Sequence, residues 1–155
     1  MRIDRDAIWY YHGSPIRRKE LVCLFASALT RNEKGEYWLI TPKEMCVVEV
    51  EDVPFLAVEL FTAGTGDQQV VSLRSNVDEI VSVDSDHPIH VVTDSVTGEP
   101  LPYLVLRGGL EARITRSVYY ELISLGAENQ LKGENFFGVW SSGCFFPLGK
   151  LDEDS

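Results

Sequence analysis

The sequence predicts an α+β fold in which mostly antiparallel strands combine with two amphipathic helices. Segments of alternating apolar and polar residues, rich in β-branched and aromatic side chains, recur along the chain and are separated by turn-forming residues. Two other stretches show helical spacing of apolar residues. The length of 155 residues suggests one compact domain over 1–155, which can bury a core without disulfides or a structural metal.

Eleven segments have the strand pattern: Ile8–Tyr11, Tyr37–Thr41, Met45–Glu51, Phe55–Phe61, Gln69–Arg74, Ile80–Val83, Ile89–Thr93, Tyr103–Arg107, Leu110–Ile114, Phe136–Trp140 and Cys144–Leu148. Turn-forming residues lie between them. Residues 32–35 and 63–67 are rich in Gly, Asn and Asp and predict hairpin loops, whereas residues 94–100 predict a longer loop.

The first helix is expected to begin at Ser14. Serine is a favoured N-cap, and Pro15 suits the first helical position because its missing N–H would have no partner there. One apolar stripe follows at helical spacing, formed by Leu21, Leu24, Phe25 and Ala28.

The second helix is expected to begin after Thr115 as its N-cap. Its apolar stripe consists of Val118, Leu122 and Leu125. Gly126 follows at the position where glycine commonly terminates a helix.

The two helices belong to an internal repeat. Glu20–Leu24 parallels Glu121–Leu125, and further on Lys34–Trp38 parallels Lys132–Phe137. The shared order predicts two strand–helix–strand–strand units, within residues 7–82 and 83–150. Leu21 and Leu122 should then be equivalent, and both should be buried.

Charge and cysteine content exclude several classes of function. The net charge is −10, with +2 in residues 1–45, −10 in residues 46–100 and −2 in the remainder. An acidic middle third repels phosphate backbones and anionic lipid, so neither nucleic acid nor a membrane is expected as a partner. No apolar run approaches a membrane span, and the N-terminus is too polar for a signal peptide. The three cysteines form no C-x-x-C pair, which favours reduced thiols in the cytoplasm.

The start of the first helix is a candidate anion site. Ser14 as the cap would leave helix N–H groups free, and Arg17 and Arg18 would add donors in the same turn. His12 lies beside them in the sequence. The alternative is that both arginines pair with carboxylates of the fold or lie solvated.

A second polar group surrounds the paired glycines Gly108 and Gly109. Two glycines between strand signals predict a bend, with a positive φ or a close backbone approach at one of them. Arg107, Glu111 and Arg113 would converge there, either to fix the bend, which we favour, or to bind an anion.

No metal, cofactor or catalytic constellation is expected. His87 and His90 form an H-x-x-H pair near Asp84 and Asp86, but no third strong ligand has suitable spacing. The glycines of residues 64–66 lack the Gly-Lys-Ser/Thr of a phosphate loop, and no serine lies in a G-x-S-x-G elbow.

Six strings resemble the bacterial domain-of-unknown-function family numbered twelve eighty-five: Trp9–Leu21, Tyr37–Pro42, Val53–Phe55, Pro102–Leu104, Arg107–Arg113 and Gly138–Gly143. The resemblance runs from about Trp9 to Gly149. It implies an α+β fold with repeated motifs and a role in signalling or ligand binding. The family has no established catalytic residues to carry over.

The sequence thus favours a non-enzymatic module that binds a small ligand, an anion for example, or a partner protein in bacterial signal transduction. Its main rival is an enzyme whose arginines hold a small anionic substrate, with His12 as the base. A third reading is a structural protein that assembles into oligomers through an edge strand.

Overall fold

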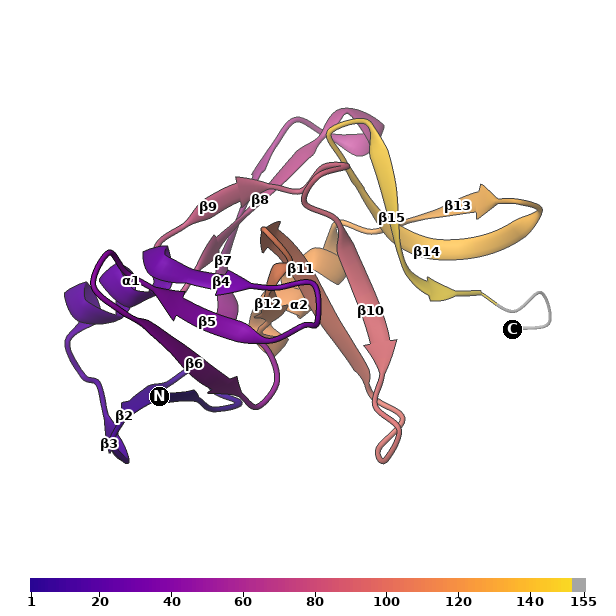
Figure 1. Ribbon diagram of the computed structural model, residues 1–155. Helices are drawn as coiled ribbons and strands as arrows, with labels where there is room; N and C mark the ends of the chain where they lie inside the picture. The colour runs from indigo at the N-terminus through magenta and orange to yellow at the C-terminus, as the bar shows by residue number, and fades with distance from the viewer. Residues whose placement is uncertain (152–155) are drawn as a thin grey trace.

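The computed structural model describes residues 1–151, which form fifteen strands, two α-helices and one 3-10 helix, η1 (Gly66–Gln68) (Figure 1). The helices are α1 (Lys19–Ala28) and α2 (Arg116–Ser124). The strands are β1 (Arg2–Ile3), β2 (Trp9–Tyr11), β3 (Ser14–Pro15), β4 (Leu29–Arg31), β5 (Tyr37–Ile40), β6 (Met45–Val50), β7 (Phe55–Ala63), β8 (Val70–Ser75), β9 (Ile80–Ser82), β10 (Ile89–Thr93), β11 (Pro100–Arg107), β12 (Leu110–Ile114), β13 (Ala127–Leu131), β14 (Glu134–Ser141) and β15 (Cys144–Lys150).

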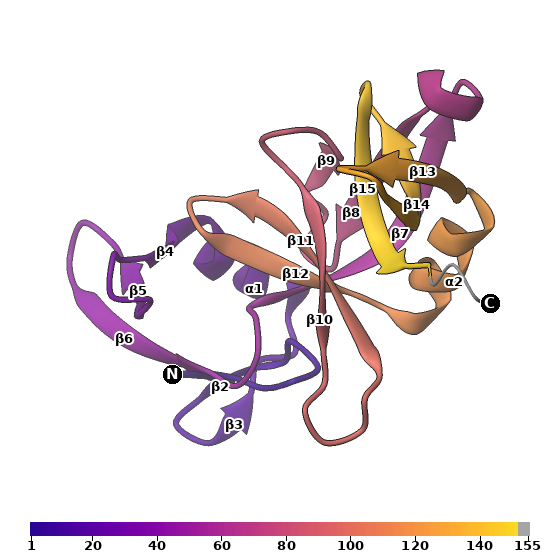
Figure 2. The same ribbon diagram turned by 90° about the vertical axis from the view of Figure 1, so that its right-hand side faces the viewer.

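The strands form three sheets, which confirms the predicted α+β class. Two sheets have six strands each, in the orders β3-β2-β1-β6-β5-β4 and β10-β11-β12-β7-β8-β9, and the third has the order β13-β14-β15. Among the described pairs, β1 with β6 and β12 with β7 are parallel and the others antiparallel. Figure 2 shows the sheet of β7–β12 between the N-terminal sheet and the C-terminal β13–β15 hairpins.

The predicted repeat is present. In each copy a helix runs directly into three consecutive antiparallel strands, α1 into β4–β6 and α2 into β13–β15. Gly35 and Gly133, the matched glycines of the two strings, both have a φ of +80° in the first turn of their three-strand units. The central sheet pairs strands from both sides of position 82/83, so the predicted unit boundary does not coincide with a boundary between sheets.

The two helices are buried to different extents. Leu122 is fully buried, as expected, whereas Leu21 is 38% exposed and Leu24 is 63% exposed. The prediction that Leu21 is buried is therefore wrong, and Leu24, of the same apolar stripe, is exposed as well. The helix α1 packs through another side, where Ala26 is buried and the Cys23 thiol lies 3.7 Å from the Val77 carbonyl.

The start of α1 also differs from the prediction. Its N-cap is Arg18, and Ser14 lies in β3 instead, so Ser14 caps no helix. The reason is a hairpin turn at His12 and Gly13, whose φ values of +50° and +80° fold β3 back onto β2. Two consecutive left-handed residues are the signature of a two-residue hairpin turn.

The β11–β12 turn confirms the bend predicted at the paired glycines. Gly108 and Gly109 have φ values of +53° and +79°, and Arg107 pairs with Leu110 across them. A left-handed conformation at both central residues is readily adopted by glycine.

Buried polar groups hold the third sheet to the second. Ser141 is fully buried, and its Oγ accepts a hydrogen bond from the Val71 amide at 2.8 Å and donates to the Val83 carbonyl at 2.7 Å. Gln69 adds a bond from Nε2 to the Trp140 carbonyl at 2.9 Å. These bonds satisfy backbone groups of adjoining segments, so they position the C-terminal hairpins on the central sheet.

Candidate functional site

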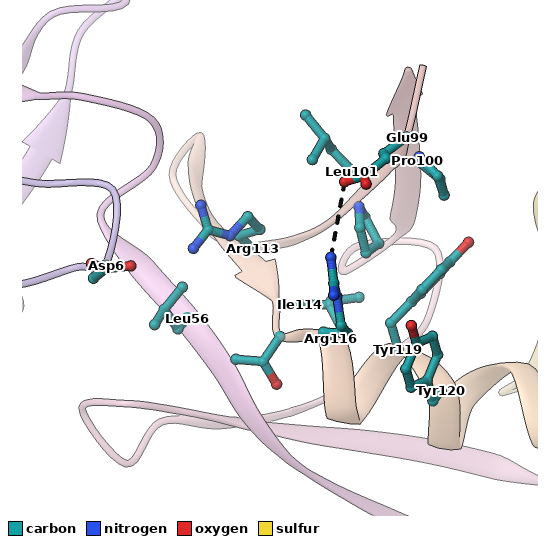
Figure 3. Close-up of a pocket in the computed structure, with 12 residues that line it drawn as sticks. Asp6, Leu56, Glu99, Pro100, Leu101, Arg113, Ile114, Arg116, Tyr119 and Tyr120 are labelled. Atoms are coloured by element: carbon teal, nitrogen blue, oxygen red, sulfur yellow. Dashed lines mark ion pairs between the residues drawn. The ribbon is translucent and has the colours of Figure 1, made fainter. Parts of the chain in front are cut away.

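A surface pocket of about 660 Å³ opens where β11 begins and α2 starts. We call it the α2 pocket (Figure 3). Its apolar and aromatic lining comes from Leu56, Pro100, Leu101, Pro102, Ile114, Tyr119 and Tyr120. Its charged lining comes from Asp6, Glu99, Arg113 and Arg116.

The chain builds this pocket because β12 passes directly into α2. Thr115 is the N-cap, as predicted, and its carbonyl accepts the first helical hydrogen bond from the Tyr119 amide at 2.8 Å. The Thr115 side chain makes no capping bond, and the first turn has no acidic residue. The chain itself therefore does little to neutralise the positive end of the helix dipole, which faces this region.

Arg113 is fixed by its neighbours. Its Nη1 lies 3.4 Å from the Asp52 carboxylate, which also accepts a hydrogen bond from the Tyr103 hydroxyl at 3.0 Å. Burial, followed by this hydrogen bond to Asp52, raises the pKa of Tyr103 to about 12. The phenol therefore stays protonated at neutral pH and works as a donor that holds Asp52 in place.

Arg116 is much less constrained. Its closest carboxylate is that of Glu99, at 4.0 Å, and the two side chains are 75% and 61% exposed. An exposed pair at this distance contributes little to stability. Figure 3 shows Arg116 directed toward Glu99, whereas Arg113 is directed to the opposite side, toward Asp6 and Leu56.

The polar network predicted around the paired glycines does not form. Arg107 bonds to Glu79 at 2.8 Å and to the Ala26 carbonyl at 2.9 Å, while Glu111 bonds to His90. Arg113, as described above, pairs with Asp52 instead. The β11–β12 register shifts between Val105 and Arg107, so Arg107 pairs with Leu110 and leaves the face of Glu111 and Arg113. Glu111 and Arg113 share a face but bond to different partners. Arg107 instead ties α1 to the central sheet, and a structural role for the three residues at the bend stays a prediction.

The first-helix residues do not form the predicted cluster either. Because Ser14 lies in β3 and Arg18 is the N-cap, the geometry proposed for an anion site at this helix start is wrong, and anion binding there stays a prediction. Arg17 has no hydrogen bond or ion pair within residues 1–151, and Arg18 lies 4.0 Å from Glu20 with both side chains more than 80% exposed.

His12 lies apart from these arginines. It lines a second pocket, of about 320 Å³, together with Arg2, Tyr10 and Glu49. Neither of the two pockets includes Arg17 or Arg18 among its lining residues. The enzyme hypothesis needs His12 beside arginines that hold a substrate, but the arginine that lines its pocket, Arg2, is already paired with Glu51 at 2.9 Å.

The H-x-x-H pair forms two separate contacts. His87 bonds to Asp84 at 2.8 Å, and His90 bonds to Glu111 on β12. Burial alone would raise the pKa of Asp84, but hydrogen bonds from the His87 ring and from backbone amides outweigh it and lower that pKa. Within residues 1–151 no group of three or more metal-ligating side chains gathers, and all three cysteines are free thiols.

Among the pocket residues, Glu99 and Arg116 were not predicted as site residues, and neither was the Asp52–Tyr103 pair that holds Arg113. The sequence does contain a pattern that could have identified Arg116 as a site residue. An N-cap threonine flanked by Arg113 and Arg116 is the same combination of cap and arginines that was sought at Ser14. Asp52 and Tyr103 are far apart in the sequence, so only the assembled sheets bring them together.

The described helices also include no segment with the length and apolar character needed to cross a membrane.

Comparison with known proteins places residues 1–148 in one family. Residues 1–53 match the N-terminal domain and residues 54–148 the C-terminal domain of a family described as of unknown function, DUF1285. The first matched part contains α1 with β4–β6, and the second contains α2 with β13, β14 and most of β15. No curated protein matches the chain.

Two solved structures are similar to it. One is a DUF1285 family protein from Silicibacter pomeroyi, with 42% identity and a TM-score of 0.89 over 99% of this chain and 81% of that chain. The other is a DUF1285 family protein from Shewanella baltica, with 27% identity and a TM-score of 0.63 over 79% of this chain and 89% of that chain.

Proposed function

This chain belongs to the DUF1285 family, and we propose that it is a non-enzymatic module that binds a small anionic ligand in the α2 pocket. The observation that supports this most is the pocket itself, about 660 Å³ in volume, with an aromatic wall beside a helix start that has no side-chain capping bond and a loosely held arginine. Volumes of 300–1,000 Å³ with mostly apolar walls and a few polar groups are typical of small-molecule sites.

The apolar wall suits the body of a ligand. Tyr119 and Tyr120 project from α2, while Pro100, Leu101 and Pro102 lie on the facing strand. Tyrosine supplies apolar area together with a hydroxyl that can bond a polar group. We therefore expect a ligand with a flat or apolar portion between these two walls.

The helix start and Arg116 suit an anionic group. Free N–H groups and the dipole favour negative charge at a helix N-terminus, and a guanidinium pairs with carboxylate or phosphate in bidentate geometry. Arg116 can turn to a ligand at little cost, because its contact with Glu99 is long and exposed. Glu99 would then compete with the ligand for the same guanidinium.

We place this module in the cytoplasm of a bacterium, in signal transduction. Three free thiols support a reducing compartment. A ligand held between β11 and α2 would contact the junction of the central sheet and the C-terminal repeat. Ligand binding would change the conformation of this junction, and a partner protein would recognise the change.

A thermal-shift screen of the whole chain across inorganic anions, carboxylates, nucleotides and other metabolites tests the proposal. A ligand at 100 times its dissociation constant stabilises a protein by about 2.7 kcal/mol, which is readily measured. For any hit, Arg116→Ala should weaken binding by roughly tenfold, the scale of one charge-assisted hydrogen bond. Glu99→Gln should strengthen binding, because it removes the competing carboxylate.

Arg17→Ala is the matched control, since it removes an exposed arginine at the other helix and should leave binding unchanged. Hits that respond to Arg17→Ala and not to Arg116→Ala would move the site to α1. Hits that weaken in Glu99→Gln would mean that the ligand carries a positive charge, contrary to the proposal.

A further inference from the structure

A second surface, separate from the α2 pocket, is formed by the start and outer side of α1. We call it the α1 face and define it by Arg17, Arg18, Leu21 and Leu24. We propose that the α1 face docks an acidic segment of a partner protein that carries large apolar side chains. Two independent observations support this, one from the internal repeat and one from charge.

The first observation is that the matched leucines of the two repeated helices differ in burial. In the C-terminal copy, Leu122 is fully buried, and α2 packs on β7 and β14. In the N-terminal copy, the matching Leu21 is 38% exposed, and Leu24, one turn further on, is 63% exposed. The two leucines are neighbours on the helix surface, so they present one apolar patch to solvent.

Charge indicates the chemistry of the occupant. Arg17 has no partner within residues 1–151, and Arg18 has only a 4.0 Å contact with Glu20 in a pair more than 80% exposed. Two cations before a helix are also disfavoured by its dipole, so an external carboxylate gains from both arginines and from the helix end. Lys19, by contrast, is already bound to Asp78 at 3.1 Å.

A second copy of this chain fits the α1 face less well than an acidic partner does. Each copy carries a net charge of −10, so two copies repel each other. Several carboxylates of the acidic middle segment are also occupied within the fold: Glu59 and Asp78 by Arg74, Glu79 by Arg107, and Asp84 by His87. A separate acidic segment with leucine- or phenylalanine-like side chains would complement both the arginines and the leucines.

Selection from a phage-displayed library of random peptides against the intact protein tests this directly. The enriched peptides should have net negative charge and spaced large apolar residues. The best peptide, synthesised with a fluorescent label, should bind in an anisotropy assay. Its dissociation constant should rise roughly tenfold or more in Leu24→Asp and in the double variant Arg17→Glu/Arg18→Glu.

Val96→Asp is the matched control, because Val96 is 89% exposed in the β10–β11 loop, and it should leave the affinity unchanged. The proposal is overturned if no peptide is enriched, if the enriched peptides are neutral or basic, or if they bind Leu24→Asp as well as the wild type. It is also overturned if light scattering shows a dimer that Leu24→Asp converts to monomer, since a second copy then covers the face.

Discussion

Tyr103 lies where the central sheet meets the segment after β6, and its hydroxyl donates to Asp52 at 3.0 Å. The same carboxylate pairs with Arg113, which lines the α2 pocket. Tyr103 does not line the pocket, but through Asp52 it sets the position of Arg113, which does. At this scale the sequence showed which side chains were charged, but not their partners, because Asp52 and Arg113 are joined only by the folding of two sheets.

The Tyr103→Phe variant tests this contact. Loss of the hydroxyl leaves Asp52 with Arg113, at 3.4 Å, as its remaining donor, which should lower the free energy of unfolding by about 1–3 kcal/mol in urea at neutral pH. The pKa of Tyr103 is raised from 10.0 to about 12, so the protonated phenol is favoured by folding. Its contribution should be complete below pH 10 and lost as the pH rises through about 12.

Absorbance titration of the phenols gives a second readout. The wild type should show an ionisation step near pH 12 that Tyr103→Phe lacks. Tyr11→Phe, at an exposed tyrosine, serves as control and should retain the step. If Tyr103→Phe instead loses absorbance change near pH 10, the ordinary value, Asp52 does not hold this phenol.

At the scale of elements, turn chemistry decides the structure. All eleven predicted strands are present, and four further ones, β1, β3, β4 and β13, were missed. The first three contain only two or three residues each, and β13 is mostly polar, so none shows strand alternation. The predicted start of α1 at Ser14 was wrong for a related reason. The Ser-Pro pair matches a helix start, but the hairpin turn at His12 and Gly13 places this pair in β3.

Gly109→Ala tests the β11–β12 turn. Alanine is strained at the observed φ of +79°, and its Cβ would also meet the Arg31 side chain at 3.7 Å, an ordinary contact. Strain should therefore dominate, with a loss of more than about 1 kcal/mol in the free energy of unfolding. Gly149→Ala is the control, because its Cβ would enter open space without a positive φ. Equal losses in the two variants would refute the turn argument.

At the scale of the whole molecule, the fold combines two helix-and-three-strand units with a central sheet. The matching strings revealed the repeat because they recur in the same order, and local patterns were enough to recognise it. The assembly could not be read in the same way. The joining of β7–β9 to β10–β12, and of β1 to β6, depends on contacts between distant segments. The edges of the sheets, such as β4 and β10, leave assembly through an edge strand as a prediction.

The unequal burial of the repeats has a measurable consequence. Leu122→Ala removes a fully buried side chain and should lower the free energy of unfolding by about 2–5 kcal/mol. Leu21→Ala, at the matching position, removes a side chain that is 38% exposed and should cost less than about 1 kcal/mol. Urea unfolding of both variants checks this. Similar losses of unfolding free energy in the two variants would mean that Leu21 is buried in solution.

The central claim is that the α2 pocket is the ligand site, and amide NMR of the whole chain titrated with phenyl phosphate tests it most directly. This probe combines a flat ring with an anion. We predict saturable shift changes at Leu101 and at residues 113–120, which lie at the pocket, and their loss in Arg116→Ala. Changes centred on residues 12–18, or a uniform drift equal to that in sodium chloride of the same ionic strength, would contradict the account.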